Sequence, residues 1–185
     1  GLVECFGSKE AFLKKLDELF AVSSVVEGME TSPDISGLIG QYAHGNEPSH
    51  HIIYLYTMAG EPWKAADKVR EVTGALYTSA PDGLSGNEDV GQMSAWYILS
   101  AMGFYQAEPG SGRYWFGSPL VDEAEITVEK GIFRVVVENN SDKNRYIQSV
   151  ELNGKAYDKG YIEHKDIAAG GTLTFRMGTE KKIWY

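Results

Sequence analysis

Two short polar loops hold most of the side chains in this chain that could do chemistry. One of them lies in residues 83–97, Gly-Leu-Ser-Gly-Asn-Glu-Asp-Val-Gly-Gln-Met-Ser-Ala-Trp-Tyr, where a glycine-bracketed acidic loop runs into an apolar helix. Glu88 and Asp89 stand at the start of that helix, where unpaired N–H groups and the helix dipole favour negative charge. An isolated Asp at such a place is more often only an N-cap. Because Asn87, Glu88 and Asp89 together exceed what a cap requires, the loop predicts part of an active site.

The other polar loop, residues 44–51, reads His-Gly-Asn-Glu-Pro-Ser-His-His and also precedes an apolar segment. Three of the four histidines of the chain lie within these eight positions. Asn46 and Glu47 offer oxygen ligands, while His44 and His50 offer hydrogen-bond donors and acceptors. Taken alone, Glu47 and the proline after it would more commonly mark a helix start with an acidic cap. The grouping of histidines with oxygen ligands favours a functional loop.

The two loops together resemble the last part of the catalytic domain of glycoside hydrolase family 92, the calcium-dependent exo-acting alpha-mannosidases. The resemblance spans roughly residues 28–128 and is carried by residues 45–50, 86–97, 101–105 and 117–120. It implies an (α/α)₆-barrel domain that follows an N-terminal β-sandwich domain. It also implies inverting hydrolysis of terminal alpha-linked mannose, with alpha-1,2 the expected linkage, and a bound Ca²⁺.

The resemblance also implies roles for the acidic loop. Inverting hydrolysis needs one acid that protonates the leaving oxygen and one base that activates water on the opposite face of the sugar. The family motif places the general base at Asp89, and Glu88 is the local competitor for that role. Some members of the family carry a second acidic residue at the position of Asn87, whose amide could orient water but could not share the work of the base.

The histidine loop is expected to serve the metal and the sugar. Calcium takes six to eight oxygen ligands from carboxylates, carbonyls and water. Asn46 and Glu47 are the predicted protein ligands, with Asp89 near the ion directly or through water. His44, His50 and Glu47 are the predicted contacts to the hydroxyl groups of the sugar. Ca²⁺ is the one cofactor that the resemblance implies.

Composition excludes several other classes of protein. The formal net charge of −9 argues against a nucleic-acid partner, because phosphates require clusters of Lys and Arg. No apolar run approaches the roughly 20 residues of a membrane span. Cys5 is the only cysteine, so no disulfide can form within the chain. No signal peptide is recognisable in the first residues of the sequence. The resemblance nevertheless favours a bacterial protein that is periplasmic, at the cell surface or secreted in its full-length form.

Hydrophobic periodicity predicts an α+β chain whose pattern changes after Gly103. Helices are expected over 9–20, with Ser8 as its N-cap, and over 48–59 and 91–102, with another that begins at Pro62. Strands are expected over 126–128, 133–137, 146–152, 161–167 and 172–176, with a hairpin turn at Asn153 and Gly154. We therefore expect partial (α/α)₆-barrel helices in residues 1–112, followed by a small antiparallel β module in residues 113–185.

An (α/α)₆ barrel needs more helices than this sequence predicts, so the chain is expected to be the C-terminal piece of a larger enzyme. Its partners would be the N-terminal remainder of that enzyme and mannose-terminated glycans. The general acid is expected upstream, since residues 1–36 carry no recognisable acid motif. The 185 residues alone are therefore expected to be inactive.

Two rival interpretations stay open. Another (α/α)-barrel glycosidase or a phosphorylase would share helices with acidic loops, but not this pair of motifs in this order. A non-catalytic carbohydrate-binding or scaffold module could use the four Trp, eleven Tyr and seven Phe to stack on sugars. Most of these rings fall at core spacing in helices or strands, which favours packing instead. Activity on an aryl alpha-mannoside and its loss with a chelator would separate the enzyme from the binding module.

Overall fold

A computed structural model describes residues 1–25 and 35–185, which cluster into two compact units. The first unit contains Gly1–His50 and Val72–Ser94, and the second contains His51–Glu71 and Ala95–Tyr185. Residues 44–50 and 83–94 of the two polar loops therefore belong to the first unit. The predicted division into residues 1–112 and 113–185 stays a prediction about the complete protein.

The first unit begins with two helices, α1 (Leu2–Cys5) and α2 (Lys9–Ala21). The hydroxyl of Ser8 accepts a hydrogen bond from the backbone N–H of Ala11 at 3.0 Å, which confirms the predicted N-cap. One face of α2 buries its apolar side chains: Phe12, Leu13, Leu16 and Phe20. A small antiparallel hairpin follows, β1 (Leu38–Ile39) with β2 (Tyr42–Ala43).

The single helix predicted for residues 48–59 is wrong in detail. The structure has three short elements there: the 3₁₀ turns η1 (Glu47–Ser49) and η2 (Ile52–Tyr54), and the helix α3 (Leu55–Met58). Tertiary hydrogen bonds explain the difference, because the buried hydroxyls of Tyr54 and Thr57 bond Ser100 and the carbonyl of Phe116. Such contacts override local helix propensity.

The longer helices α4 (Pro62–Ala75) and α5 (Gln92–Ala101) begin within a residue of their predicted starts. Residues 44–103, all of them described, contain helices and turns but no strand. The α+β content is therefore confirmed. The (α/α)₆ barrel stays a prediction, since these helices do not close one by themselves.

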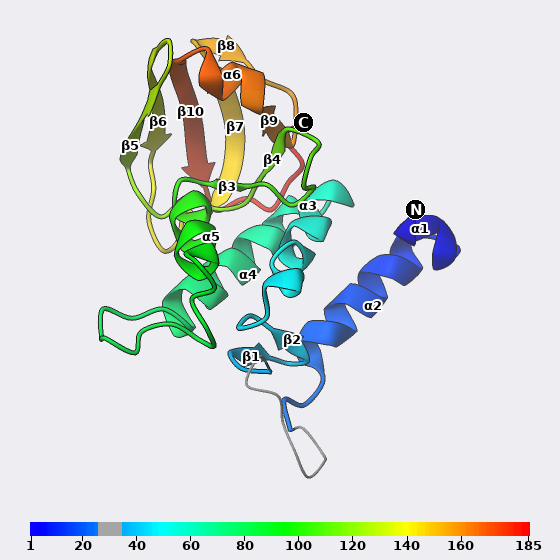
Figure 1. Cartoon of the computed structure of the whole chain (residues 1–185). Helices are drawn as coiled ribbons and strands as arrows, with labels where there is room; N and C mark the ends of the chain where they lie inside the picture. The colour runs from blue at the N-terminus through cyan, green and yellow to red at the C-terminus, as the bar shows by residue number, and fades with distance from the viewer. Residues whose placement is uncertain (26–34) are drawn as a thin grey trace. The chain divides into compact units, whose positions relative to one another are not determined.

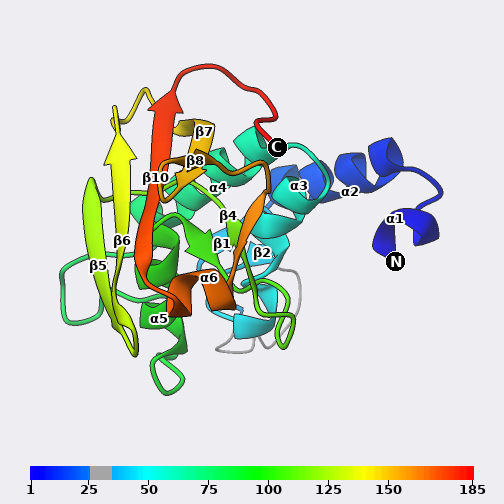
Figure 2. The ribbon, with the colours of Figure 1, turned by 90° about the horizontal axis from the view of Figure 1, so that it is seen from above.

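Most strands lie in the second unit, where a five-stranded sheet has the order β5-β6-β10-β7-β8 (Figure 1 and Figure 2). The bounds of its strands are β5 Glu123–Val128, β6 Gly131–Glu138, β7 Tyr146–Leu152, β8 Lys155–Ala156 and β10 Gly171–Gly178. Neighbours are antiparallel except β6 and β10, which are parallel, so the predicted antiparallel module has one exception. A three-stranded sheet joins β3 (Phe104–Tyr105), β4 (Arg113–Phe116) and β9 (Tyr161–Glu163).

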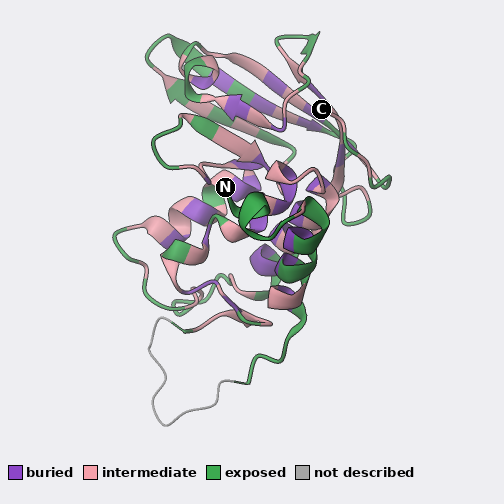
Figure 3. Ribbon diagram, turned by 90° about the vertical axis from the view of Figure 1, so that its right-hand side faces the viewer, coloured by how far each residue is buried: buried purple, intermediate pink, exposed green. Residues whose placement is uncertain are grey.

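The core of the second unit lies on one face of the larger sheet. Buried residues alternate along its strands, as the burial colours show (Figure 3). In β6 the inward side chains are Phe133, Val135 and Val137. Half-buried Leu99 and Met102 pack against the same apolar cluster.

Two details of the strand-rich tail test the sequence pattern. The hairpin turn predicted at Asn153 and Gly154 is confirmed, with φ angles of 52° and 73° between β7 and β8. The strand predicted for 161–167 is wrong beyond its third residue, because α6 (His164–Ala168) follows β9. The short helix α6 buries Ile167 in the apolar core of the second unit.

Candidate functional site

The two polar loops touch at their glycines. The N–H of Gly45 donates to the carbonyl of Ser36 at 3.0 Å. A Cβ added to Gly86 would lie 2.7 Å from the carbonyl oxygen of Gly45, and one added to Gly45 would lie 2.1 Å from the hydroxyl of Ser36. These distances leave no room for a side chain. The glycines therefore allow two backbone segments, more than 40 residues apart in sequence, to lie in direct contact.

The acidic loop has an unusual backbone immediately before α5. Asp89 and Val90 have φ angles of 47° and 59°, and Gly91 follows at 92°. The left-handed region is uncommon for Asp and a marked outlier for a β-branched residue such as Val. Val90 is also fully exposed, so its side chain gains no burial in return. Strained backbone of this kind is typical of functional loops, where other interactions hold it in place.

Glu88 is engaged with the first turn of α5. Its Oε1 accepts a hydrogen bond from the backbone N–H of Ser94 and its Oε2 accepts one from the Ser94 hydroxyl, each at 3.1 Å. The carboxylate thereby satisfies a donor that the helix leaves unpaired at its start. The structure thus gives Glu88 a capping contact, in keeping with the simpler of the two interpretations of this loop.

Asp89 and Asn87 are both exposed, whereas Glu88 between them is half-buried. The carbonyl of Asp89 accepts a hydrogen bond from the N–H of Gln92 at 3.3 Å. Among the residues that the structure describes, none donates a hydrogen bond to the Asp89 carboxylate. An exposed carboxylate beside a helix start can reach water or a ligand, whereas the Glu88 carboxylate is already bonded.

His44 and His50 are both buried, with exposed fractions of 0% and 1%. Their rings stack with centroids 4.6 Å apart. Burial lowers the pKa of His44 to about 3, with repulsion from His50 as a smaller cause. Burial also lowers the pKa of His50 to about 4, against its hydrogen bond to the carbonyl of His44. Both imidazoles are therefore neutral near pH 7.

All four ring nitrogens of this pair have protein partners. Nδ1 of His44 lies 2.8 Å from the hydroxyl of Tyr42, and its Nε2 lies 2.6 Å from the hydroxyl of Tyr77. Nε2 of His50 lies 3.0 Å from the carbonyl oxygen of His44, and its Nδ1 lies 3.1 Å from the side-chain amide of Gln92. The predicted contact of these histidines with sugar hydroxyls stays a prediction.

Asn46 and Glu47, the predicted calcium ligands, lie at the start of η1 and are half-buried. Asn46 is the N-cap residue, but its side chain makes no capping hydrogen bond. The buried hydroxyl of Ser36, next to Gly45, has no hydrogen-bond partner within the described part of the chain. Within that same part, no three His, Cys, Asp or Glu side chains gather as a metal cluster. The oxygen donors suit a hard cation, and they are fewer than calcium's usual six to eight.

Sequence reasoning missed three residues of this site: Tyr42, Tyr77 and Gln92. Tyr77 is 33 positions from His44, and no local pattern connects the two residues. Gln92 does lie within the acidic motif, and its polar side chain at the start of an apolar helix was the one sequence signal that it belongs to the site. Its amide bonds a histidine 42 positions earlier.

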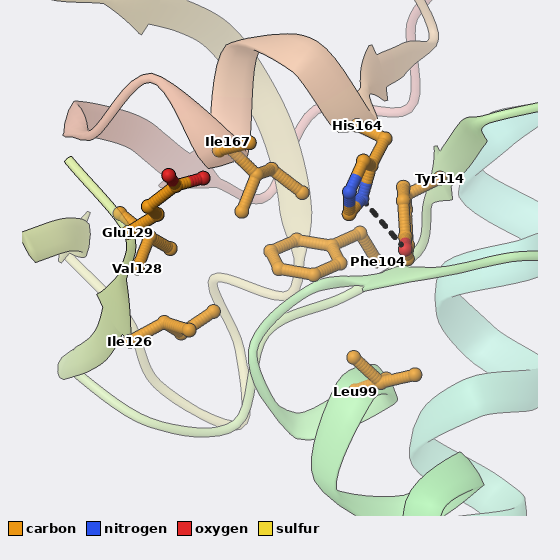
Figure 4. Close-up of a pocket in the computed structure, with 9 residues that line it drawn as sticks. Leu99, Phe104, Tyr114, Ile126, Val128, Glu129, His164 and Ile167 are labelled. Atoms are coloured by element: carbon orange, nitrogen blue, oxygen red, sulfur yellow. Dashed lines mark hydrogen bonds between the residues drawn. The ribbon is translucent and has the colours of Figure 1, made fainter.

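A separate apolar cavity of about 420 Å³ lies in the second unit (Figure 4). Its lining includes Leu99, Phe104 and Ile126, with Glu129 at one end and His164 at the other. The hydroxyl of Tyr114 lies 3.3 Å from Nδ1 of His164. None of the residues predicted to be catalytic, metal-binding or sugar-binding lines this cavity.

Comparison with known proteins agrees with the two loop motifs. The family model described as the glycosyl hydrolase family 92 catalytic domain matches residues 1–179. A family GH92 alpha-mannosidase from Bacteroides thetaiotaomicron, solved with mannoimidazole, is 43% identical and superposes with a TM-score of 0.86, over 93% of this chain and 23% of that one. A family GH92 inverting mannosidase from the same bacterium is 36% identical, with a TM-score of 0.80 over 97% of this chain and 25% of that one.

A curated relative is an uncharacterized secreted glycosidase from Arthroderma benhamiae, 31% identical over 144 residues. The match covers 76% of this chain and 19% of the relative. The chain thus spans about a fifth to a quarter of the proteins that it resembles. Within the described residues, no helix is both long and apolar enough to cross a bilayer.

Proposed function

The chain belongs to glycosyl hydrolase family 92, and from this membership we propose that the protein that carries it is an inverting exo-alpha-mannosidase that depends on Ca²⁺. Its substrates are glycans with terminal alpha-linked mannose, with alpha-1,2 as the preferred linkage. Two similar structures support this proposal: an alpha-mannosidase bound to mannoimidazole, and a mannosidase described as inverting. The secreted relative supports a protein that acts outside the cytoplasm, in the periplasm, at the cell surface or in the medium.

The observation that carries the proposal is the contact between the two loops. Gly45 and Gly86 bring the Asn46–Glu47 pair and the Asp89 loop into one compact unit. A glycosidase of this kind needs a base and a ligand set that act on one sugar. The close backbone packing of the loops that carry Asp89 and the Asn46–Glu47 pair supports this proposal.

Asp89 is the general base in this proposal. Its carboxylate is exposed just before α5, where it can reach a water molecule and accept its proton. Glu88 is the weaker candidate, because both of its carboxylate oxygens accept hydrogen bonds from Ser94. The exposed amide of Asn87 would orient the attacking water beside Asp89.

Asn46 and Glu47 would hold the calcium ion, with Asp89 near it directly or through water. An amide oxygen and a carboxylate are the donors that this cation prefers. When bound, the ion would supply positive charge for the hydroxyl groups of the terminal mannose. Glu47 would also lie close to those hydroxyl groups.

The general acid would come from residues outside this chain, so the chain alone would not hydrolyse mannosides. The decisive experiment uses the complete protein and an aryl alpha-mannoside, with the anomer of the first-formed mannose read by proton NMR. We expect release of beta-mannose, complete inhibition by a chelator and recovery with Ca²⁺. Release of alpha-mannose, or full activity in the chelator, would contradict the proposal.

A further inference from the structure

Two hydrogen-bonded relays connect the histidine loop with the start of α5. The first relay contains Tyr42, His44, Tyr77 and the carbonyl of Met93. The second contains Gln92, His50 and the carbonyl of His44. Both relays lie within the first unit and end at adjacent residues of α5.

The first relay has a single consistent direction. The hydroxyl of Tyr77 donates to the carbonyl of Met93 at 3.1 Å, and a hydroxyl has only one proton to donate. The Tyr77 oxygen must therefore accept from Nε2 of His44, which lies 2.6 Å away. A neutral imidazole protonated at Nε2 accepts at Nδ1, where the hydroxyl of Tyr42 lies at 2.8 Å and must donate.

The second relay fixes its own histidine in the same way. The carbonyl of His44 can only accept, so Nε2 of His50 must carry the proton in the 3.0 Å bond between them. Nδ1 of neutral His50 is then an acceptor, and the side-chain amide of Gln92 donates to it at 3.1 Å. Both histidines thus have the Nε2-protonated tautomer: Tyr77 accepts from Nε2 of His44, and Gln92 donates to Nδ1 of His50.

We propose that Tyr77 and Gln92 are positioning residues that fix the position of the two loops relative to each other through the fixed tautomers of His44 and His50. The inference rests on the proposed function, because this relative position matters for turnover only if Asp89 and Glu47 serve the same sugar. Neither Tyr77 nor Gln92 needs to touch the substrate. Each acts by orienting a buried imidazole of the 44–51 loop, and a displacement of the order of 1 Å at a catalytic group costs about 10²-fold in rate.

The test uses the complete protein with Tyr77→Phe and Gln92→Met, two nearly isosteric changes that remove only the polar group. Matched controls are Tyr114→Phe, which removes another tyrosine–histidine bond, and Gln148→Met, which removes amide bonds to two carbonyls. Hydrogen exchange by mass spectrometry reports local order, and steady-state kinetics reports kcat and KM separately.

We expect faster exchange confined to peptides that cover residues 44–51 and 83–94 in both test variants. We also expect kcat to fall by about tenfold or more while KM changes by less than about threefold, with both controls at wild-type values. Wild-type exchange in these peptides, or a rise spread evenly over the whole protein, would overturn the positioning role. Local loosening with an unchanged kcat would also overturn it.

The failure of the proposed function would look different. A complete wild-type protein that hydrolyses no alpha-mannoside at any calcium concentration would refute the activity itself. In that case the exchange measurement still decides whether Tyr77 and Gln92 order the two loops.

Discussion

Gln92 donates a hydrogen bond from its side-chain amide to Nδ1 of His50 across 3.1 Å, and this bond joins the first residue of α5 to the loop that carries Glu47. The two residues are 42 positions apart. His50 is buried, so water cannot replace the amide at that nitrogen without a change in packing. The loop of Asn46 and Glu47 is therefore tied by side chains, in addition to the backbone contact at the glycines.

The glycines where the loops meet should not tolerate a side chain. Gly45→Ala and Gly86→Ala should each lower the free energy of unfolding by more than about 2 kcal/mol, because the added Cβ would overlap Ser36 or the Gly45 carbonyl. Gly74 in α4 is the matched control, since a Cβ there would meet nothing within 4 Å. Gly74→Ala should raise stability by about 0.5–1 kcal/mol. Urea unfolding of the three variants checks the order, and equal effects at all three positions would refute the close packing.

Stability should fall in mild acid because of the buried histidines. Their pKa values in the folded chain are about 3 and 4, below the ordinary 6.5, so the unfolded chain binds more protons between those limits. The contribution is fully present above pH 6.5 and is lost as the pH falls through about 4 for His50 and about 3 for His44. Melting temperatures across this range should therefore drop more steeply for wild type than for His50→Asn.

If His50→Asn gave the same slope of melting temperature against pH as wild type, His50 would not be buried in its neutral form.

Glu88 should contribute to stability through Ser94. Glu88→Ala should cost about 1 kcal/mol, the usual effect of a lost helix cap. Ser94→Ala should cost less, because the backbone N–H that Glu88 also binds is retained. A double-mutant cycle measures the coupling of the two side chains, and additive losses would show that they do not interact.

Glu47→Ala should weaken calcium binding in the complete protein, so that added Ca²⁺ restores part of the lost activity. If Glu47 only caps a helix, the same change would cost about 1 kcal/mol of stability and leave the rate of folded enzyme unchanged. Calorimetric titration with Ca²⁺ alone separates the two cases. Glu71→Ala, which removes a surface ion pair with Lys68, serves as the control for the loss of one negative charge.

Local signals explain which parts of the fold the sequence could predict. Ser8 at the start of α2 and the Asn153–Gly154 turn depend on residues within a few positions, and both were predicted correctly. The break in the helix predicted for 48–59 depends on Ser100 and Phe116, which lie far along the chain. Periodicity holds no information about such partners.

The same reasoning applies to the candidate site. Asp89 and Glu47 stand in motifs that the sequence displays directly, whereas the bond between His44 and Tyr77 joins segments that only the folded chain brings together. Burial of His44 was also hidden, because a histidine in a polar loop is normally expected to face solvent. The motifs therefore display the candidate acidic residue and oxygen ligands, whereas the partners of His44 and His50 become visible only in the folded chain.

The most direct test of the account is kcat of Asp89→Asn in the complete protein, with an aryl alpha-mannoside and saturating Ca²⁺. Asn tolerates the left-handed backbone found at this position, so the loop should keep its conformation. The account predicts that kcat falls by about 10²–10⁴-fold, the usual contribution of a general base, while the melting temperature stays that of wild type. A kcat within about threefold of wild type would contradict the assignment of Asp89 as the base.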